Sequence, residues 1–229
     1  MKGAMEAPSR RKALLGVHHA GVALLRRSGM AGLLILLLFG MFVLPVLFPS
    51  GEDITVTGRI VIVLIFVCGI VAISESPRMA VLVAVLAALV IVARVAERLV
   101  PAFDIAKWHD AVLLAALFVL AIAVGTGVFA TKRAIADRLF GAIALYLLLS
   151  LIWAALYALV AGNNPNAFAG SLPSRATLFD WGYFSLVTLT TVGYGDITPA
   201  AHIAKSLATL EALVGQLYPA IIIARLVSA

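Results

Sequence analysis

The sequence predicts an all-α membrane protein with six transmembrane helices, and with a short re-entrant helix and a loop between the fifth and the sixth. Three observations predict it: the composition, six long apolar runs, and a shorter apolar segment that ends in a glycine-containing loop. The 229 residues are 63% hydrophobic and only 12% charged, and the mean hydropathy is +1.12. Soluble domains carry about 25% charged residues, so this chain cannot cover itself with polar surface in water.

The six apolar runs each have about the 20 residues that a helix needs to cross the hydrocarbon core. They are residues 30–48, 56–73, 79–100, 111–130, 139–161 and 203–227. Backbone polar groups in lipid must be hydrogen-bonded within the protein, so we expect each run to be a helix.

The basic residues predict the orientation of these helices. With the N-terminus inside, eleven of the 17 lysine and arginine residues lie in or beside the inner segments. The positive-inside rule therefore predicts a multi-pass plasma-membrane protein with both termini cytoplasmic, and residues 162–202 outside. The net charge of +6 then reflects topology and not nucleic-acid binding. The single Cys68 excludes an internal disulfide or a cysteine-rich metal site.

One short segment, TVGYGD at residues 191–196, occurs once in the chain. It follows an apolar stretch, residues 179–190, that is too short to span the membrane and fits a re-entrant helix. Asp180 near the start of that stretch suits the positive end of a helix dipole.

This segment, together with the preceding TLT at 188–190, resembles the selectivity filter of the tetrameric potassium channel pore family. The resemblance covers about residues 139–229 and implies an outer helix, a pore helix, a filter and an inner helix. It implies that backbone carbonyls replace the water around a dehydrated K⁺. The filter residues are Thr191, Val192, Gly193, Tyr194 and Gly195, with the Thr191 hydroxyl as a further ligand. Gly193 and Gly195 supply positive φ values without a Cβ penalty.

One filter strand cannot surround an ion, so the single copy implies a homotetramer. The chain then divides into a basic tail at 1–28, a four-helix transmembrane domain at 29–135 and a pore domain at 136–229. The expected partners are other copies of the chain, the lipid bilayer and K⁺ as the permeating ion. No cofactor, no other metal, no catalytic residue and no nucleic acid are expected.

Four residues are expected to support the filter: Asp196, Phe184, Tyr183 and Thr190. Many members of the family carry two tryptophans at the positions of Tyr183 and Phe184. Phe184 has no N–H to give to Asp196, so the family's usual bracing of that aspartate is in question here.

Three residues of the last run are candidates for gating or conduction. Gly215 lies at the spacing of the family's hinge glycine, and Pro219 removes a backbone hydrogen bond one turn later; both have helix packing as the alternative. Glu211 is an intramembrane acid, which is a functional-site hypothesis by default. It either faces the aqueous cavity or, while neutral, hydrogen-bonds the threonines of the pore helix.

The fourth run contains no arginine or lysine, so we expect weak or absent voltage dependence. Arg94, Glu97 and Arg98 of the third run fit an ion-paired cluster rather than a sensor. Two alternatives to a potassium channel stay open: a weakly selective cation channel, and a non-conducting regulatory or sensor subunit. An enzyme is disfavoured, because the sequence has no paired-histidine zinc motif and no Gly-x-Ser-x-Gly nucleophile.

Overall fold

The computed structural model describes residues 29–48, 52–73, 76–99, 105–129, 134–173 and 176–227. The predicted basic tail at 1–28 and the side chains of the predicted cluster of Arg94, Glu97 and Arg98 lie outside the described residues.

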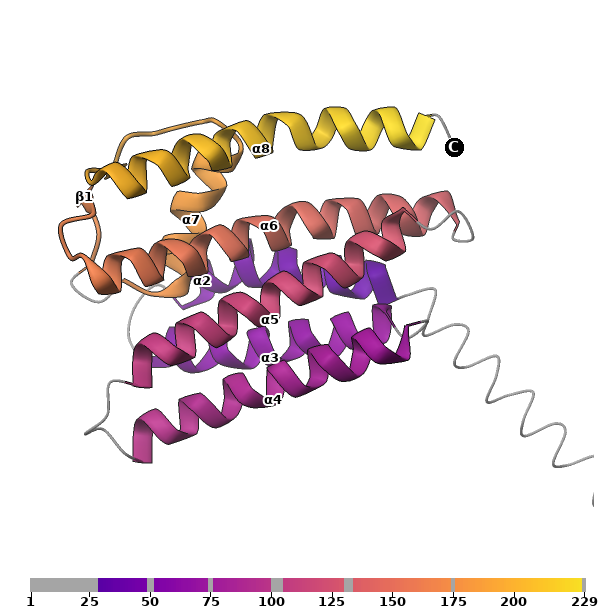
Figure 1. Ribbon diagram of the computed structural model, residues 1–229, viewed down its shortest axis with the longest axis horizontal. Coiled ribbons are helices and arrows are strands. Elements are labelled where there is room, and N and C mark those ends of the chain that lie inside the picture. Colours follow the sequence, from indigo (N-terminus) through magenta and orange to yellow (C-terminus); the bar gives the residue numbers. More distant parts are fainter. Residues whose placement is uncertain are drawn as a thin grey trace, which may run out of the picture.

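Long helices dominate the described chain and run side by side as a bundle (Figure 1). The first helical segment is residues 29–47, which contains the π-helical turn η1 (Phe39–Val43) and α2 (Leu44–Leu47). The others are α3 (Glu52–Ala72), α4 (Pro77–Leu99), α5 (Ile105–Val128), α6 (Ile135–Asn163) and α8 (His202–Val227). All six predicted runs are therefore helical over the residues that the structure describes. The helices α3, α5 and α6 begin four to six residues earlier than predicted, because flanking residues continue the helical hydrogen bonds.

Four of these helices are long and apolar enough to cross a membrane. They are Gly29–Leu47, His109–Phe129, Ile135–Asn163 and His202–Arg225. Within the described residues, α3 and α4 contain shorter apolar helical stretches, Thr57–Ala72 and Pro77–Ala93. The chain is thus a multi-pass helical membrane protein, and the count of six spans stays a prediction.

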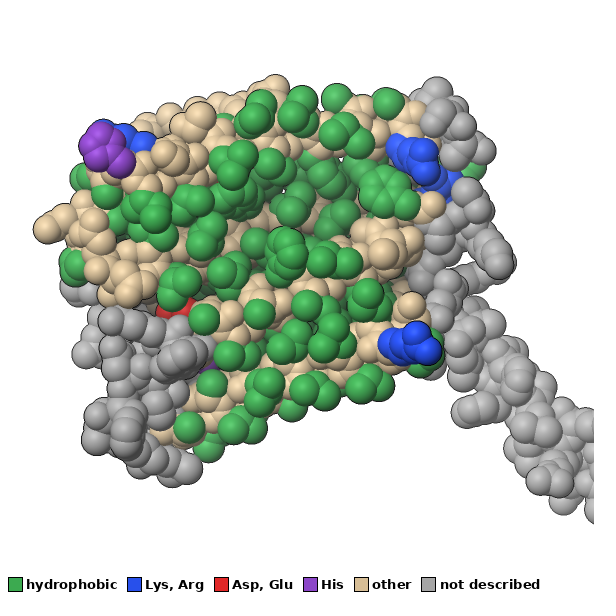
Figure 2. Space-filling model, in the orientation of Figure 1, with side chains coloured by type: hydrophobic (Ala, Val, Ile, Leu, Met, Phe, Trp, Pro, Cys, Tyr) green, Lys and Arg blue, Asp and Glu red, His purple; other side chains and the backbone are tan. Residues whose placement is uncertain are grey.

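The surface of the bundle has the polarity that a bilayer requires. Hydrophobic side chains cover the middle of the face in Figure 2, and lysine, arginine and histidine side chains gather at its two ends. Val81, Val85 and Val92 of α4 are each more than half exposed. Such side chains are stable at the surface only when lipid or another apolar surface covers them.

The main core lies where α5 and α6 meet the N-terminal helices. Leu120 and Val124 of α5, Leu148 of α6, Val83 of α4 and Leu37 of the first segment are fully buried in one cluster. Packing is therefore continuous across the predicted boundary between the four-helix domain and the pore domain.

Arg138 joins the end of α5 to the start of α6. Its side chain is only 5% exposed, and its Nε donates a hydrogen bond to the carbonyl of Val128 at 3.0 Å. That carbonyl is among the last four of α5, which have no partner within their own helix. Arg138, one of the eleven basic residues beside the predicted inner segments, therefore also caps the C-terminal end of α5.

A short antiparallel ribbon lies at the opposite end of the bundle. It pairs β1 (Phe168–Gly170) with β2 (Ile197–Pro199), with Ala169 opposite Thr198. The ribbon was not predicted, because three-residue strands have no readable alternation. It ties the loop before the short helix α7 (Leu178–Leu189) to the loop that follows residues 191–196.

Candidate functional site

The first element of the site is α7, whose N-terminus is closed by a capping box. The amide and the hydroxyl of Thr177 donate hydrogen bonds to Asp180 Oδ2 at 2.6 and 2.8 Å, in a capping box. Asp180 lies in the first turn of the helix, as expected. The helix has 12 residues, so it is about 18 Å long and cannot span a hydrocarbon core of about 30 Å.

The chain leaves α7 in a non-helical strand whose backbone alternates in handedness. Positive φ values occur at Thr191 (59°), Gly193 (58°) and Gly195 (80°). The two glycines behave as expected, whereas Thr191 was not expected to adopt a left-handed conformation. The intervening Val192 and Tyr194 have negative φ, so every second residue of the strand is left-handed.

The amides of this strand turn back into the end of α7. The amide of Thr191 donates to the carbonyl of Thr188 at 2.9 Å, and those of Val192 and Gly193 donate to the carbonyl of Val187 at 2.9 and 3.2 Å. Within the described part of the chain, no backbone amide donates to a carbonyl of residues 191–195. The strand therefore carries a row of carbonyl acceptors that are free to bind something else.

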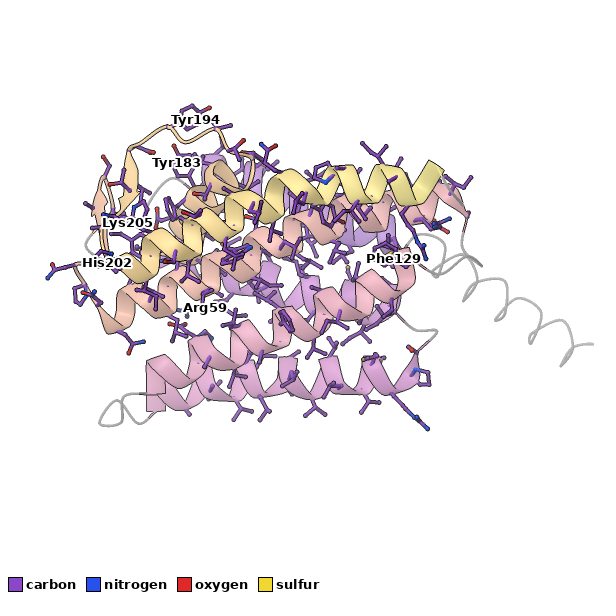
Figure 3. The ribbon with its side chains drawn as sticks, turned by 45° about the horizontal axis from the view of Figure 1, so that its top comes forward. Arg59, Phe129, Tyr183, Tyr194, His202 and Lys205 are labelled. Carbon is purple, nitrogen blue, oxygen red and sulfur yellow. The ribbon has the colours of Figure 1, made fainter. Side chains whose placement is uncertain are left out.

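The strand is also exposed. Val192 is 53% and Tyr194 71% exposed, although both side chains are large and apolar or aromatic. Tyr194 stands on the loop that projects beyond α7 in Figure 3. Non-helical backbone at membrane depth is tolerated only when protein or water surrounds it, and the described residues of this chain leave much of the strand uncovered.

Asp196, just after the strand, is braced on both its side chain and its backbone. Tyr183 on α7 donates its hydroxyl to Asp196 Oδ2 at 2.9 Å. The amide of Ser171 donates to the Asp196 carbonyl at 2.8 Å. Gly170, with φ of +113°, allows this close approach, because a Cβ there would lie 2.0 Å from the same carbonyl oxygen. Hydrogen bonding to Asp196 raises the pKa of Tyr183, so the hydroxyl is a neutral donor.

The bracing that the sequence left in question is therefore supplied by Tyr183 and not by Phe184. Phe184 is 5% exposed and packs against Tyr157, with ring centroids 4.9 Å apart, and against Phe168. Its role is to fill the aromatic core beneath the strand. Thr190 Oγ1 donates to the carbonyl of Leu186 at 2.6 Å, so its hydroxyl caps its own helix.

Gly215 marks the point where α8 crosses the end of α7. A Cβ at Gly215 would lie 1.8 Å from the carbonyl oxygen of Leu189. The same carbonyl accepts a hydrogen bond from Tyr146 of α6 at 3.2 Å. The packing alternative for Gly215 thus has direct support, and a hinge stays a prediction. Pro219 lies inside an α8 that is helical throughout.

Glu211 is placed differently from both alternatives that we considered. It is fully buried, so it does not face a cavity within the single chain. Its partners are not the threonines of α7: Tyr157 of α6 donates to Oε2 at 2.5 Å, and Ser185 of α7 lies 2.5 Å from Oε1. Ser185 Oγ is also 2.9 Å from the carbonyl of Ser150. A polar cluster therefore joins three helices behind the strand.

Sequence reasoning missed Tyr157, Ser185 and Gln216. Gln216 Nε2 donates to Thr191 Oγ1 at 2.9 Å, from α8 to the first residue of the strand. A signal existed, since each of the three is a polar side chain inside an apolar helical segment, where polar groups need partners.

The comparisons with known proteins agree with this geometry. Residues 143–229, from α6 to α8, match a family described as ion channel. The Protein LctB of Bacillus caldotenax is 38% identical over 104 residues, which cover 43% of this chain and 76% of that relative. The Protein LctB of Geobacillus stearothermophilus is 37% identical over 103 residues, with the same coverage. No solved structure matches the chain significantly.

Proposed function

Because this chain belongs to the ion channel family, we propose that it conducts K⁺ selectively and passively across the membrane as a homotetramer. The family is one of channels and not of enzymes. The observation that carries the proposal is the strand at residues 191–195, with its alternating handedness and its unpaired carbonyls. Rings of backbone carbonyls can replace the hydration shell of an ion.

The homotetramer is supported by what the single chain leaves uncovered. Each chain carries one such strand, and Val192 and Tyr194 of that strand are more than half exposed. Four copies about one axis would enclose the ion with carbonyls and cover these side chains with neighbouring protein.

The negative end of the α7 dipole supports cation selectivity. The carbonyls of Val187 and Thr188, in the last turn of α7, hold the amides of the strand, so the end of the helix lies directly behind it. The partial negative charge at a helix C-terminus favours a cation nearby.

The proposed location is the plasma membrane, with the strand on the outer side and both termini inside. The strand and β1 lie at one end of the bundle, and the C-terminal end of α8 and the start of α6 lie at the other (Figure 1). Arg138 and Arg225, at the latter end, are the kind of residue that the positive-inside rule places in the cytoplasm. Weak or absent voltage dependence follows from an α5 that, over residues 111–128, contains no arginine or lysine.

The test is the reversal potential of the purified protein in planar bilayers under K⁺/Na⁺ bi-ionic conditions, with Gly193→Ala as the variant. Gly193 has φ of +58°, where alanine is strained by about 1–2 kcal/mol, so the variant should lose K⁺ selectivity. Gly162→Ala is the matched control, because a Cβ at Gly162 meets nothing within 4 Å and its φ is not positive.

Two results would redirect the proposal. Equal permeability to K⁺ and Na⁺ in the wild type would indicate a weakly selective cation channel. Absence of any flux, from protein shown to be assembled, would indicate a non-conducting regulatory or sensor subunit.

A further inference from the structure

Gln216 is the one described residue of α8 whose side chain is hydrogen-bonded to the filter strand. Its Nε2 lies 2.9 Å from Thr191 Oγ1, and the two residues are 25 positions apart in the sequence. Ala208, Ala212 and Gln216 are spaced by four residues and therefore share one face of α8. Ala208 and Ala212 line a hollow of about 310 Å³ that Thr191 also lines. This face of α8 is thus directed at the strand.

Thr191 needs such a contact because of its backbone. It is a β-branched residue at φ of 59°, and β-branched residues rarely adopt left-handed conformations. Residues of this kind persist only where their surroundings hold them. The amide of Thr191 is held by the carbonyl of Thr188, and the side chain is held by Gln216.

Gly215, next to Gln216, lets α8 approach the end of α7 that leads into the strand. Gly215 lies against the backbone of Leu189, with no room for a Cβ. The backbone of Gln216, the next residue, is therefore held close to the end of α7, and from there its side chain reaches the hydroxyl of Thr191.

We propose that Gln216 is a positioning residue for ion selectivity, which holds the Thr191 hydroxyl and carbonyl in register at the inner end of the filter. The inference rests on the proposed function. The amide occupies one lone pair of the Thr191 hydroxyl oxygen and leaves the other for a cation. In a tetramer the four Gln216 side chains would form a ring of amides at the inner entrance of the filter.

The test compares Gln216→Met, which has a similar length and no donor, with Gln216→Asn, which keeps the amide on a side chain one methylene shorter. Both should lose the bond to Thr191 and lower the K⁺/Na⁺ permeability ratio, measured from reversal potentials, about fivefold, the factor that corresponds to one hydrogen bond. In a Thr191→Val background, Gln216→Met should have no further effect. Leu217→Ala, at the next and half-exposed position, is the control and should leave the ratio unchanged.

The outcomes separate this inference from the proposed function. If the wild type is K⁺-selective and Gln216→Met or Gln216→Asn has the same K⁺/Na⁺ permeability ratio, the inference is wrong and the proposed function stands. The same holds if Gln216→Met and Thr191→Val lower that ratio additively. An unselective or non-conducting wild type overturns the proposed function. In that case the wild type and Gln216→Met are compared by melting temperature, measured on the assembled protein in Na⁺ and in K⁺. An equal rise in K⁺ for the two proteins overturns the inference as well.

Discussion

Replacing Glu211 by leucine should destabilise the protein far more than replacing it by glutamine. The carboxyl group is fully buried and holds the hydroxyls of Tyr157 on α6 and Ser185 on α7. Leucine has a similar volume but no acceptor, so it leaves both hydroxyls without their partner in a buried place. Glutamine keeps the shape and keeps one oxygen that can accept from Tyr157.

The magnitude follows from the partners that remain. A buried hydroxyl left without a partner costs about 1–3 kcal/mol. The Tyr157 hydroxyl has no other acceptor among the described residues, so the loss of its partner should cost a free energy in the upper part of that range. Ser185 can still donate to the carbonyl of Ser150 at 2.9 Å and should cost the lower part. The sum for Glu211→Leu is about 3–4 kcal/mol.

Glu211→Gln should cost about 1 kcal/mol or less. A serine hydroxyl carries one hydrogen, and Ser185 is within hydrogen-bonding distance of both Glu211 and the carbonyl of Ser150. With glutamine, the amide nitrogen can donate one hydrogen to Ser185 and Ser185 can donate to that carbonyl, so both hydroxyl hydrogens have an acceptor. The second amide hydrogen is left over, and it accounts for the remaining cost.

The assay is differential scanning fluorimetry of the purified protein in detergent, with Leu210→Ala as the control at a neighbouring half-exposed position. At about 2–4 °C per kcal/mol for a chain of this size, Glu211→Leu should melt about 6–16 °C below the wild type and Glu211→Gln within about 4 °C of it. Equal shifts for the two variants would refute the reasoning, because the hydrogen bonds would then not be what the carboxyl group contributes.

Three further predictions concern the strand and the helices that support it. Tyr183→Phe removes the hydroxyl that holds Asp196, so K⁺ currents in bilayers should decline faster during sustained opening than in the wild type; an unchanged time course would contradict the brace. The hydrogen bond to Asp196 raises the pKa of Tyr183, so the wild-type hydroxyl should hold Asp196 at neutral pH and release it only when the pH rises through the elevated pKa. A small alkaline step near neutral pH should therefore leave the decline of the current unchanged, and a faster decline after that step would contradict the raised pKa. Gly215→Ala places a methyl group against the backbone of α7 and should cost about 3 kcal/mol of stability, seen as a lower melting temperature. A variant as stable as the wild type would show that α8 can move away from α7 there, which is what a hinge requires.

The local features of this protein could be read from its sequence. The apolar runs predict helices because lipid forces the backbone to pair within each segment, and all six runs are helical. The short helix α7, its acidic first turn and the positive φ values at Gly193 and Gly195 were predicted for the same reason: each depends on neighbouring residues and on the properties of glycine. The resemblance to a channel family rested mainly on the six residues TVGYGD at 191–196.

Contacts between distant segments could not be read in this way. Tyr157 and Glu211 are 54 residues apart, Ser185 and Glu211 are 26 apart, and Gln216 reaches Thr191 across 25 residues. Which face of α8 meets α6 and which meets the strand depends on how the helices rotate and pack, and an apolar run of nearly uniform hydrophobicity carries little information about rotation. The brace at Asp196 is an instance, because only the packed structure shows that Tyr183 reaches it while Phe184 turns into the core.

The sequence by itself determined that this is a helical membrane protein with a filter-like strand, because hydropathy, helix length and glycine conformation act over a few neighbouring residues. The tertiary structure alone decided what holds that strand in place. The side chains of Tyr183, Glu211 and Gln216 find partners on other elements, and in a buried apolar setting each such partner is chosen by the geometry of packing and not by position in the chain.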